Sequence, residues 1–558
     1  MTSKTKKRSL LVVGRSPAFA SALQTRGGSE SEVLPWPLRD SSPDSEEGAI
    51  SGTDDEVVVI LLPRPEHDRV EDWLRRTRGI LAQVPKARVV LMSSLEVYGP
   101  DHHAVGMVDE NTDRWVELKN DRAEYWDQVE AGVTGAVGDH PLLVLRLAHI
   151  IGAESEGWVN RLLRRRRVVT VAGFDPTIQL IDEASCVEAV HGAIERGLAG
   201  VYNVAPPDAV PVRKILKSVG VKRFALPWSL LWLFRKRSGG YGTASSRVGR
   251  LAYLRYPCTG SGERFAKETG IELSTIRALE QFPRRKRSGL QATLDLSDYN
   301  DPHGMDVRFT HRAAESWLKF FEKVYWRIER KGFEHIPAKG PAILAGPHRG
   351  FMPLDAVMLV QMITKYTKRM PRFLLHPTLV KFSVISRFLR RMGGVMACKK
   401  NADTVLRSGD LLGIFPEGIR GAFKYYKDVY HFGRFGRSDY VRFAVKHDVP
   451  VIPFAVVGAA EIYPILGKLE WKWMKRHFEW PCIPITPTFP ILPIPLPAKW
   501  HVEILPAVHP EDFREAAEGD EEKLIALLLA EVKGRIEKST AEILKNRKSI
   551  YYGNVFDD

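Results

Sequence analysis

The sequence predicts an α/β protein of two domains, in which parallel strands alternate with helices. The first observation is length, because 558 residues exceed what one hydrophobic core usually organises. The second is that residues 9–205 alternate short runs of Val, Ile and Leu with longer amphipathic segments, the pattern of a sheet buried on both faces. The third is the polar stretch 288–306, after which a new amphipathic helix and a new apolar strand begin.

Four apolar runs mark the strands expected in the first domain. They read "SLLVVG" (9–14), "EVVVILL" (56–62), "ARVVLMSS" (87–94) and "PLLVLRLAHIIG" (141–152). The segment "EDWLRRTRGILAQV" (71–84) predicts a helix between the second and third runs. Since the runs lack in-and-out alternation, we expect a parallel sheet with helices on both faces.

The order of several motifs resembles the extended short-chain dehydrogenase and NAD-dependent epimerase family. The motifs are "LMSSLEVYG" (91–99), "VLRLAHIIG" (144–152), "FDPTIQLIDEASCVEAV" (174–190) and "GVYNVAPP" (200–207). The resemblance covers about half the chain. It implies a Rossmann-like, doubly wound parallel sheet in a domain of residues 1–285, with a smaller substrate lobe from about residue 206.

Two departures from this family bear on its cofactor. Gly14 is kept in the glycine turn, but Pro17 and Ala20 stand where the family has glycines, which hinders close approach of a dinucleotide pyrophosphate. The Tyr-x-x-x-Lys pair is missing, because Tyr125 is followed four places on by Val129. We therefore expect a degenerate domain without tight NAD(P) binding, in which Gly14 is the one cofactor-binding candidate.

Two other segments of this half are open to more than one interpretation. "LPWSLLWLFRKRS" (226–238) fits an interfacial membrane helix or an ordinary helix of the lobe. Runs of cations such as "RLLRRRR" (161–167) are typical of solvated faces, and without a recognisable motif no nucleic acid is expected as a partner. Residues 286–308 are expected to be a linker and 309–558 a second domain.

The second domain contains a histidine and an aspartate that are candidates for catalysis. The segment "RAAESWLKFFEKVYWRIERKGFEHI" (312–336) predicts an amphipathic helix, and the next apolar strand ends at Gly346. His348 follows that strand and Asp355 follows His348. A carboxylate that fixes the tautomer of a histidine lets the imidazole take a proton from a hydroxyl. These two residues are the catalytic candidates.

Three further blocks complete a resemblance to the glycerolipid acyltransferase superfamily over residues 310–510. They read "RRMGGVMACKKNAD" (390–403), "GDLLGIFPEGIRG" (409–421) and "KHDVPVIPFAVVG" (446–458). Later segments, including "PITPTFPILPIPLPAKW" (484–500), resemble its diacylglycerol-acyltransferase-like branch. His348 and Asp355 are separated by six residues where four are common in the superfamily, so their contact requires a bulged loop. The Pro-rich segment fits either a lipid interface or a lining of the core.

The resemblance implies roles for the residues of these blocks. The Pro-Glu-Gly turn after a buried strand aims Glu417 and Arg420 into one pocket, Gly418 permits close approach, and Arg420 suits a phosphate or polar head group. Lys400 stands where arginine is usual and keeps the charge without the fork. These four residues are the substrate-binding candidates.

The composition limits the partners and the compartment. The net charge of +15 favours an anionic partner, here an anionic membrane surface. The four cysteines form no C-x-x-C pair, so neither a zinc site nor a disulfide framework is expected. No run of about 18 apolar residues is present. We expect a protein of the cytoplasm, peripheral on the inner face of a membrane.

The function that the sequence predicts is that of an O-acyltransferase with a hydroxyl of a glycerolipid as acceptor. Acyl-CoA or acyl carrier protein is the expected donor, a lysophospholipid or a diacylglycerol-like lipid the acceptor, and no cofactor or metal is required. Two alternatives remain. One is an NAD-dependent epimerase or dehydrogenase acting on a sugar or lipid-linked substrate, with an accessory acyltransferase domain; the other is a non-catalytic lipid-binding scaffold.

Overall fold

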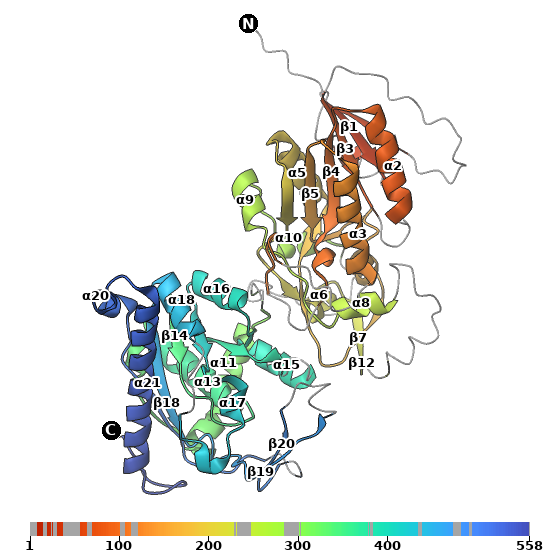
Figure 1. Ribbon diagram of the computed structural model, residues 1–558. Helices are drawn as coiled ribbons and strands as arrows, with labels where there is room; N and C mark the ends of the chain where they lie inside the picture. Colours follow the sequence, from red (N-terminus) through yellow and green to blue (C-terminus); the bar gives the residue numbers. More distant parts are fainter. Residues whose placement is uncertain are drawn as a thin grey trace. The chain divides into compact units, whose positions relative to one another are not determined.

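The chain divides into two compact units, Met1–Gly304 and Met305–Asp558 (Figure 1). The computed structural model describes residues 8–14, 19, 21–23, 25, 31–36, 56–63, 70–100, 106–112, 121–227, 230, 247–283, 301, 303–377, 379, 383–432, 438–472, 481–489, 491 and 494–556. Most of the expected interfacial helix at 226–238 lies outside these residues. None of the helices in the described parts of the chain combines the length and hydropathy that a membrane-spanning segment needs.

The first unit is built on a six-stranded parallel sheet in the order β10-β5-β4-β3-β1-β2. Because β1 lies between β2 and β3, the chain winds first in one direction and then in the other, which makes the sheet doubly wound. The strands are β1 (Arg8–Val13), β2 (Ser31–Trp36), β3 (Glu56–Leu61), β4 (Arg88–Ser94), β5 (Leu142–Leu147) and β10 (Gly200–Val204). The expected fold class is confirmed for this unit.

Helices cover both faces of this sheet. α2 (Val70–Gln83) and α3 (Asp121–Ala136) lie on one side, and α5 (Glu183–Glu195) lies on the other (Figure 1). The helices α2 and α3 approach closely at Gly132, where a Cβ would lie 2.6 Å from the side chain of Leu74. Burial on both faces explains why these strands are continuous apolar runs.

A smaller lobe packs beside the carboxyl ends of these strands. It contains three strand pairs and several short helices around a core that includes Trp158, Leu180 and Ile215. The pairs are β6 (His149–Ile151) with β9 (Leu180–Asp182), β7 (Arg167–Val171) with β12 (Lys222–Leu226), and β8 (Thr177–Ile178) with β11 (Val210–Pro211); the helices are α4 (Trp158–Leu163), α6 (Val212–Ser218), α8 (Arg247–Tyr253), α9 (Glu263–Thr269) and α10 (Thr275–Gln281).

The second unit contains a seven-stranded sheet in the order β13-β21-β18-β14-β17-β15-β16. Its pairs are parallel except β18 with β21. The strands are β13 (Glu329–Lys331), β14 (Ala342–Ala345), β15 (Arg372–Leu375), β16 (Val395–Met396), β17 (Leu411–Ile414), β18 (Val451–Val457) and β21 (His501–Ile504). This unit is α/β as well, as expected.

The core of the second unit has two layers, one on each face of the sheet. Along β14, Leu344 belongs to the cluster that contains α13 (Leu354–Thr367), whereas Ile343 belongs to the opposite cluster. The second cluster takes side chains from α16 (Lys399–Arg407), α18 (Asp439–His447) and α21 (Glu521–Asn546). The final amphipathic helix expected from the sequence is thus present and packs on the domain.

The prediction of a single amphipathic helix over residues 312–336 was wrong. The helical segment consists of three short pieces, α11 (Val307–Glu315), α12 (Trp317–Phe320) and a π-turn at Phe321–Tyr325, and β13 follows. Ser316 leaves helical geometry at φ −111° and ψ −109°. Glu322 explains the tight turn, because its buried carboxylate accepts hydrogen bonds from Gln361 and Lys365 of α13, each at 2.8 Å.

Candidate active site

The two motifs of the expected site follow two neighbouring strands. β14 ends at Ala345 and β17 ends at Ile414, and these two residues are paired in register. Since the strands are parallel, the residues that follow them emerge at the same edge of the sheet. Gly346 makes the exit from β14 possible, because a Cβ there would lie 2.3 Å from the ring of Phe454. His348 and the turn that contains Glu417 are therefore brought to one place.

His348 and Asp355 are in direct contact. Asp355 Oδ2 accepts a hydrogen bond from His348 Nδ1 at 2.7 Å and another from the Arg349 backbone N–H at 2.8 Å. Its Oδ1 accepts from the Ala356 backbone N–H at 2.8 Å. The carboxylate is fully buried in the first turn of α13, where the helix dipole favours a negative charge. The contact that the sequence left conditional on a bulged loop is present.

The loop between these residues bulges around an aromatic side chain. Gly350 has φ +122°, a left-handed conformation that favours glycine. Phe351 is buried at the tip and packs against the rings of Phe423, Tyr463 and Phe489. The two extra residues are thus taken up by an anchored bulge, and α13 still begins where Asp355 reaches the imidazole.

The imidazole of His348 has one nitrogen left for chemistry. Its ring stacks on Phe415 with centroids 4.5 Å apart and an interplanar angle of 18°. Among the residues that the structure describes, Nε2 has no hydrogen-bond partner, and the side chain is 14% exposed. With Nδ1–H donated to Asp355, Nε2 carries a lone pair that can accept a proton.

Glu417 is held by two cations that the sequence analysis did not single out. Arg349 Nη1 donates to Glu417 Oε2 at 3.3 Å, and Lys424 Nζ donates to Glu417 Oε1. The Arg349 side chain is fully buried, and its guanidinium lies over the ring of Phe432. Burial lowers the pKa of Arg349, and the charge of Glu417 opposes that shift. In the sequence, the one feature that could have drawn attention to Arg349 was its position between His348 and the loop that bulges.

The other three substrate-binding candidates lie on two different helices. Gly418 has φ +55° and opens the short helix α17 (Gly418–Ala422), and its N–H donates to the Phe415 carbonyl at 2.9 Å. Arg420 is exposed on α17 and has no ion-pair partner among the described residues. Lys400 lies half-buried in the first turn of α16, which follows β16 at the far edge of the sheet.

The cofactor-binding candidate Gly14 follows β1 in the first unit. It has φ +146°, and a Cβ there would lie 2.7 Å from Leu62 Cβ. The missing side chain is therefore explained by the close packing of β1 against the end of β3. Pro17 and Ala20 lie outside the described residues.

Comparisons with known proteins identify a family for part of the chain. Residues 327–457 match the Acyltransferase family. The uncharacterized protein ML2427 of Mycobacterium leprae is 30% identical over 285 residues, 50% of this chain and 75% of that protein. The uncharacterized protein Rv0502 of Mycobacterium tuberculosis is 31% identical over 285 residues, 50% of this chain and 76% of that protein.

Two further similarities are more distant. Phytyl ester synthase 2, chloroplastic, of Arabidopsis thaliana is 27% identical over 214 residues, 36% of this chain and 29% of that protein. A crystal structure of a human epimerase family protein with NADPH is similar at 17% identity and a TM-score of 0.37, covering 49% of this chain and 98% of that one. The chain therefore belongs to the same family as the two mycobacterial proteins, and it is an acyltransferase by its C-terminal domain.

Proposed function

We propose that the chain transfers an acyl group from acyl-CoA or acyl carrier protein to a hydroxyl of a glycerolipid, a lysophospholipid or a diacylglycerol-like lipid. The observation that carries the proposal is His348, paired through Nδ1 with the buried Asp355 and with Nε2 unpartnered among the described residues. It lies at the sheet edge that it shares with the Phe415–Glu417 turn.

In the proposed reaction, His348 Nε2 accepts the proton of the acceptor hydroxyl as the oxygen attacks the thioester carbonyl. Asp355 stabilises the imidazolium that forms and keeps the ring oriented. The tetrahedral intermediate then collapses, the C–S bond breaks, and the thiolate takes the proton back from Nε2. The products are an ester and a free thiol, and His348 returns to its starting state.

The exposed cation Arg420 supports an acceptor with a polar or phosphorylated head group. It is on α17, which begins directly after Glu417 at the same sheet edge. Glu417 is compensated by Arg349 and Lys424, so its role in the proposal is to order this turn. A planar guanidinium with no ion-pair partner among the described residues suits a phosphate or an ester carbonyl.

Exposed apolar side chains beside cations support association with an anionic membrane surface. Trp317, Phe320 and Val324 are 46%, 50% and 58% exposed along the helical segment that precedes β13, and Lys319 and Lys323 lie between them. Near β19 (Gly467–Leu469) and β20 (Ile483–Ile485), further apolar side chains are exposed, namely Leu466, Leu469, Trp471, Ile485, Ile491 and Ile494. Such mixtures of aromatic, aliphatic and basic residues suit the interface of a bilayer.

The Pro-rich segment at 484–500 is buried at its end and exposed in its middle. Trp500 is buried, with its ring stacked on Trp326 at a centroid distance of 4.7 Å. Ile491 is 95% exposed. The segment therefore lines the core at its end, and its middle supports the proposed lipid contact.

The test is a lipid-product assay with labelled acyl-CoA and two acceptors, lysophosphatidate and diacylglycerol. The variant His348→Ala is expected to lose acyl transfer at least a thousandfold with a melting temperature close to that of the wild type. His447→Ala is the matched control, because His447 has the same 14% side-chain exposure and an equivalent 2.8 Å bond to Asp403. Activity of His348→Ala within a few fold of the control would exclude the proposed mechanism.

A further inference from the structure

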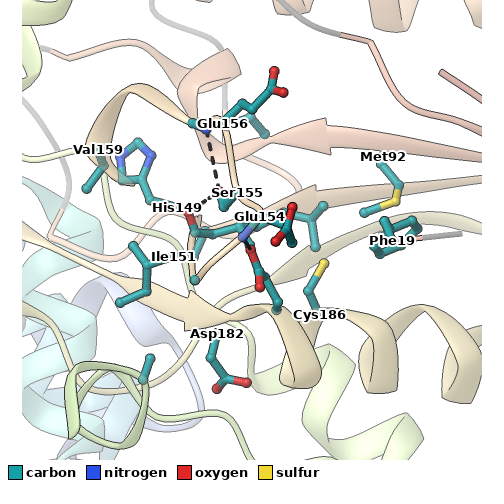
Figure 2. A pocket seen from close by; sticks show the side chains of 18 of the residues that line it. Phe19, Met92, His149, Ile151, Glu154, Ser155, Glu156, Val159, Asp182 and Cys186 are labelled. Carbon is teal, nitrogen blue, oxygen red and sulfur yellow. Dashed lines mark hydrogen bonds between the residues drawn. The ribbon is translucent and has the colours of Figure 1, made fainter. Parts of the chain in front are cut away.

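The first unit contains a cavity of about 1030 Å³ at the carboxyl edge of its parallel sheet (Figure 2). Its lining includes Phe19 after β1, Leu62 after β3, Ser94 at the end of β4 and Ala148 after β5. The order of the strands reverses at β1. In open α/β sheets, ligands bind outside the carboxyl ends of the strands at such a reversal. The position and size of the cavity therefore fit a ligand site.

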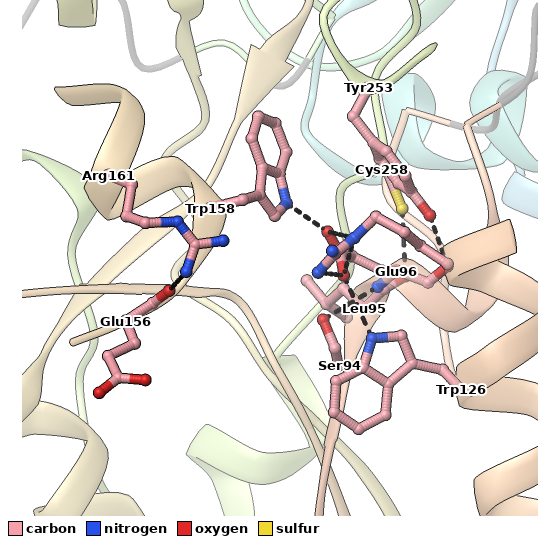
Figure 3. A network of polar contacts seen from close by, with 10 residues as sticks. Ser94, Leu95, Glu96, Trp126, Glu156, Trp158, Arg161, Tyr253 and Cys258 are labelled. Atoms are coloured by element: carbon pink, nitrogen blue, oxygen red, sulfur yellow. Dashed lines mark hydrogen bonds and ion pairs between the residues drawn. The ribbon is translucent and has the colours of Figure 1, made fainter. Parts of the chain in front are cut away.

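One buried carboxylate organises the polar side of this cavity (Figure 3). Glu96 Oε2 accepts from Arg122 Nη2 at 2.8 Å and from the Trp126 indole at 3.1 Å, while Oε1 accepts from the Trp158 indole at 2.6 Å. Burial alone would raise the pKa of Glu96, but the charge of Arg122 and the hydrogen bonds from Arg122 and Trp158 outweigh it and lower the pKa to about 2. The charges of Glu96 and Arg122 thus compensate each other.

The described residues do not fit hydride transfer with a dinucleotide. α3 contributes Arg122 and Trp126 to the lining, four residues apart, at the spacing a Tyr-x-x-x-Lys pair would have, and no tyrosine or lysine is among the described residues that line the cavity. Tyr125 lies outside the lining. The hydroxyl of Tyr98 is bonded to Arg146 and Asn203, at 2.7 and 2.9 Å.

The charge of the lining also disfavours a pyrophosphate. Arg122 is the single Lys or Arg side chain among the described lining residues, and it is paired with Glu96. The remaining charged groups are carboxylates, and the described residues that carry them are Glu154, Glu156, Asp182 and Glu183. Among the described lining residues, a dianion would meet these carboxylates without a further cation to compensate them.

The rest of the lining suits an uncharged, largely apolar molecule. Most of the other lining side chains are apolar, and Figure 2 shows Ile151, Val159, Met92 and Phe19 around the space. Burial raises the pKa of the Cys186 thiol to about 12, so that group stays neutral. Apolar walls with few polar groups are typical of sites for hydrophobic ligands.

His149 supplies one polar group for such a ligand. Its ring lines the cavity, lies edge-on to Trp158 at 5.4 Å, and makes no hydrogen bond to any residue that the structure describes. Burial lowers its pKa, so the neutral imidazole offers one donor and one acceptor. A single hydroxyl group on the ligand would pair with it.

We propose that this cavity binds a lipid alcohol, an uncharged and largely apolar molecule whose hydroxyl group contacts His149, and that it does not carry out hydride transfer. The proposal does not depend on acyl transfer at His348. The cavity would be a second lipid site of the chain, in a unit of its own.

The first experiment locates the ligand on the full-length chain. The probe is a hexadecanol analogue with a diazirine in its chain, and cross-linked peptides are mapped by mass spectrometry. We expect adducts on peptides that contain lining residues such as Met92 or Ile151, displaced by hexadecanol but not by palmitate, NADH or NADPH. Adducts confined to residues 305–558, or displacement by a reduced dinucleotide or by palmitate, would overturn the proposal.

Two variants test the assignment within the cavity. Val159→Trp fills the space next to His149 and is expected to abolish the adducts. His149→Phe keeps the volume, removes the hydrogen bond and is expected to weaken competition by hexadecanol about 2- to 10-fold, while competition by hexadecyl methyl ether, which lacks the hydroxyl donor, changes less. His191→Phe on α5 is the matched control, because His191 does not line the cavity. Equal competition in His149→Phe and the control would refute the head-group contact.

Discussion

Replacement of Asp355 by asparagine tests the proposed mechanism most directly, because it changes one charge at nearly constant shape. The carboxylate accepts three hydrogen bonds, from His348 Nδ1, the Arg349 N–H and the Ala356 N–H. In Asp355→Asn one oxygen becomes an NH₂ group and faces a donor in either orientation of the amide. The imidazolium also loses its buried counter-charge.

The size of the effect follows from the hydrogen bond between His348 and the charged carboxylate. A hydrogen bond to a charged group contributes about 1.5–3 kcal/mol, and because the imidazolium forms only during the reaction, that amount is removed from the stabilisation of the transition state. We expect kcat/KM to fall about 10- to 150-fold. Separately, the buried donor that then lacks an acceptor is expected to lower the free energy of unfolding by ~1–3 kcal/mol.

The assay is steady-state acyl transfer from acyl-CoA, with thermal unfolding measured on the same preparations. Asp403→Asn is the matched control, because Asp403 accepts a 2.8 Å bond from His447 away from the site. It is expected to lower stability without a change in turnover. If Asp355→Asn kept kcat/KM within threefold of the control, the His348–Asp355 contact would be structural and the proposed base would be wrong.

Three further outcomes are expected. Arg420→Ala should raise the KM for a phosphorylated acceptor more than tenfold with little change in kcat, and an unchanged KM would remove Arg420 from the acceptor site. Because the pKa of Glu96 is lowered to about 2, its ionised form stabilises the first unit by about 3 kcal/mol above pH ~4.5, an amount lost as the pH falls toward 2; denaturant unfolding between pH 6 and 2 should be less acid-sensitive in Glu96→Gln, and equal sensitivity would contradict this. Binding to anionic vesicles should weaken with salt and should lose its salt-resistant part in Phe320→Ser, which sedimentation would measure, whereas no binding at low salt would exclude the membrane surface.

The sequence predicted what depends on local pattern. The apolar runs of β1, β3, β4 and β5 correspond to strands because burial on both faces leaves a signal in composition. β2 was not predicted, since it contains Pro35, which reads as a break, although an edge strand tolerates proline. The order of His348, Asp355 and the Phe-Pro-Glu-Gly turn was enough to predict the two halves of the candidate site.

Contacts between distant segments were beyond such patterns. The two cations around Glu417 are Arg349 and Lys424. Neither their contact with Glu417 nor the burial of Arg349 can be read from the spacing of residues in the sequence. In the first unit, Tyr125 drew attention by residue type, yet α3 directs Arg122 and Trp126 to the cavity. Which face of a helix meets a cavity is decided by packing, which the pattern around Tyr125 does not encode.

The pairing of β14 with β17 has a consequence for how this domain tolerates change. The hydrogen bonds between the two strands hold Ala345 opposite Ile414, whatever the length of the chain that joins them. Insertions and deletions in the loops between Asp355 and Leu411 can therefore accumulate without displacing the imidazole from the glutamate turn, provided that α13 and β15 keep their packing. A slip of one residue within either short strand would turn its side chains to the other face and separate the two motifs. A library that diversifies those loops and spares the eight residues of β14 and β17 would thus leave the two motifs in place.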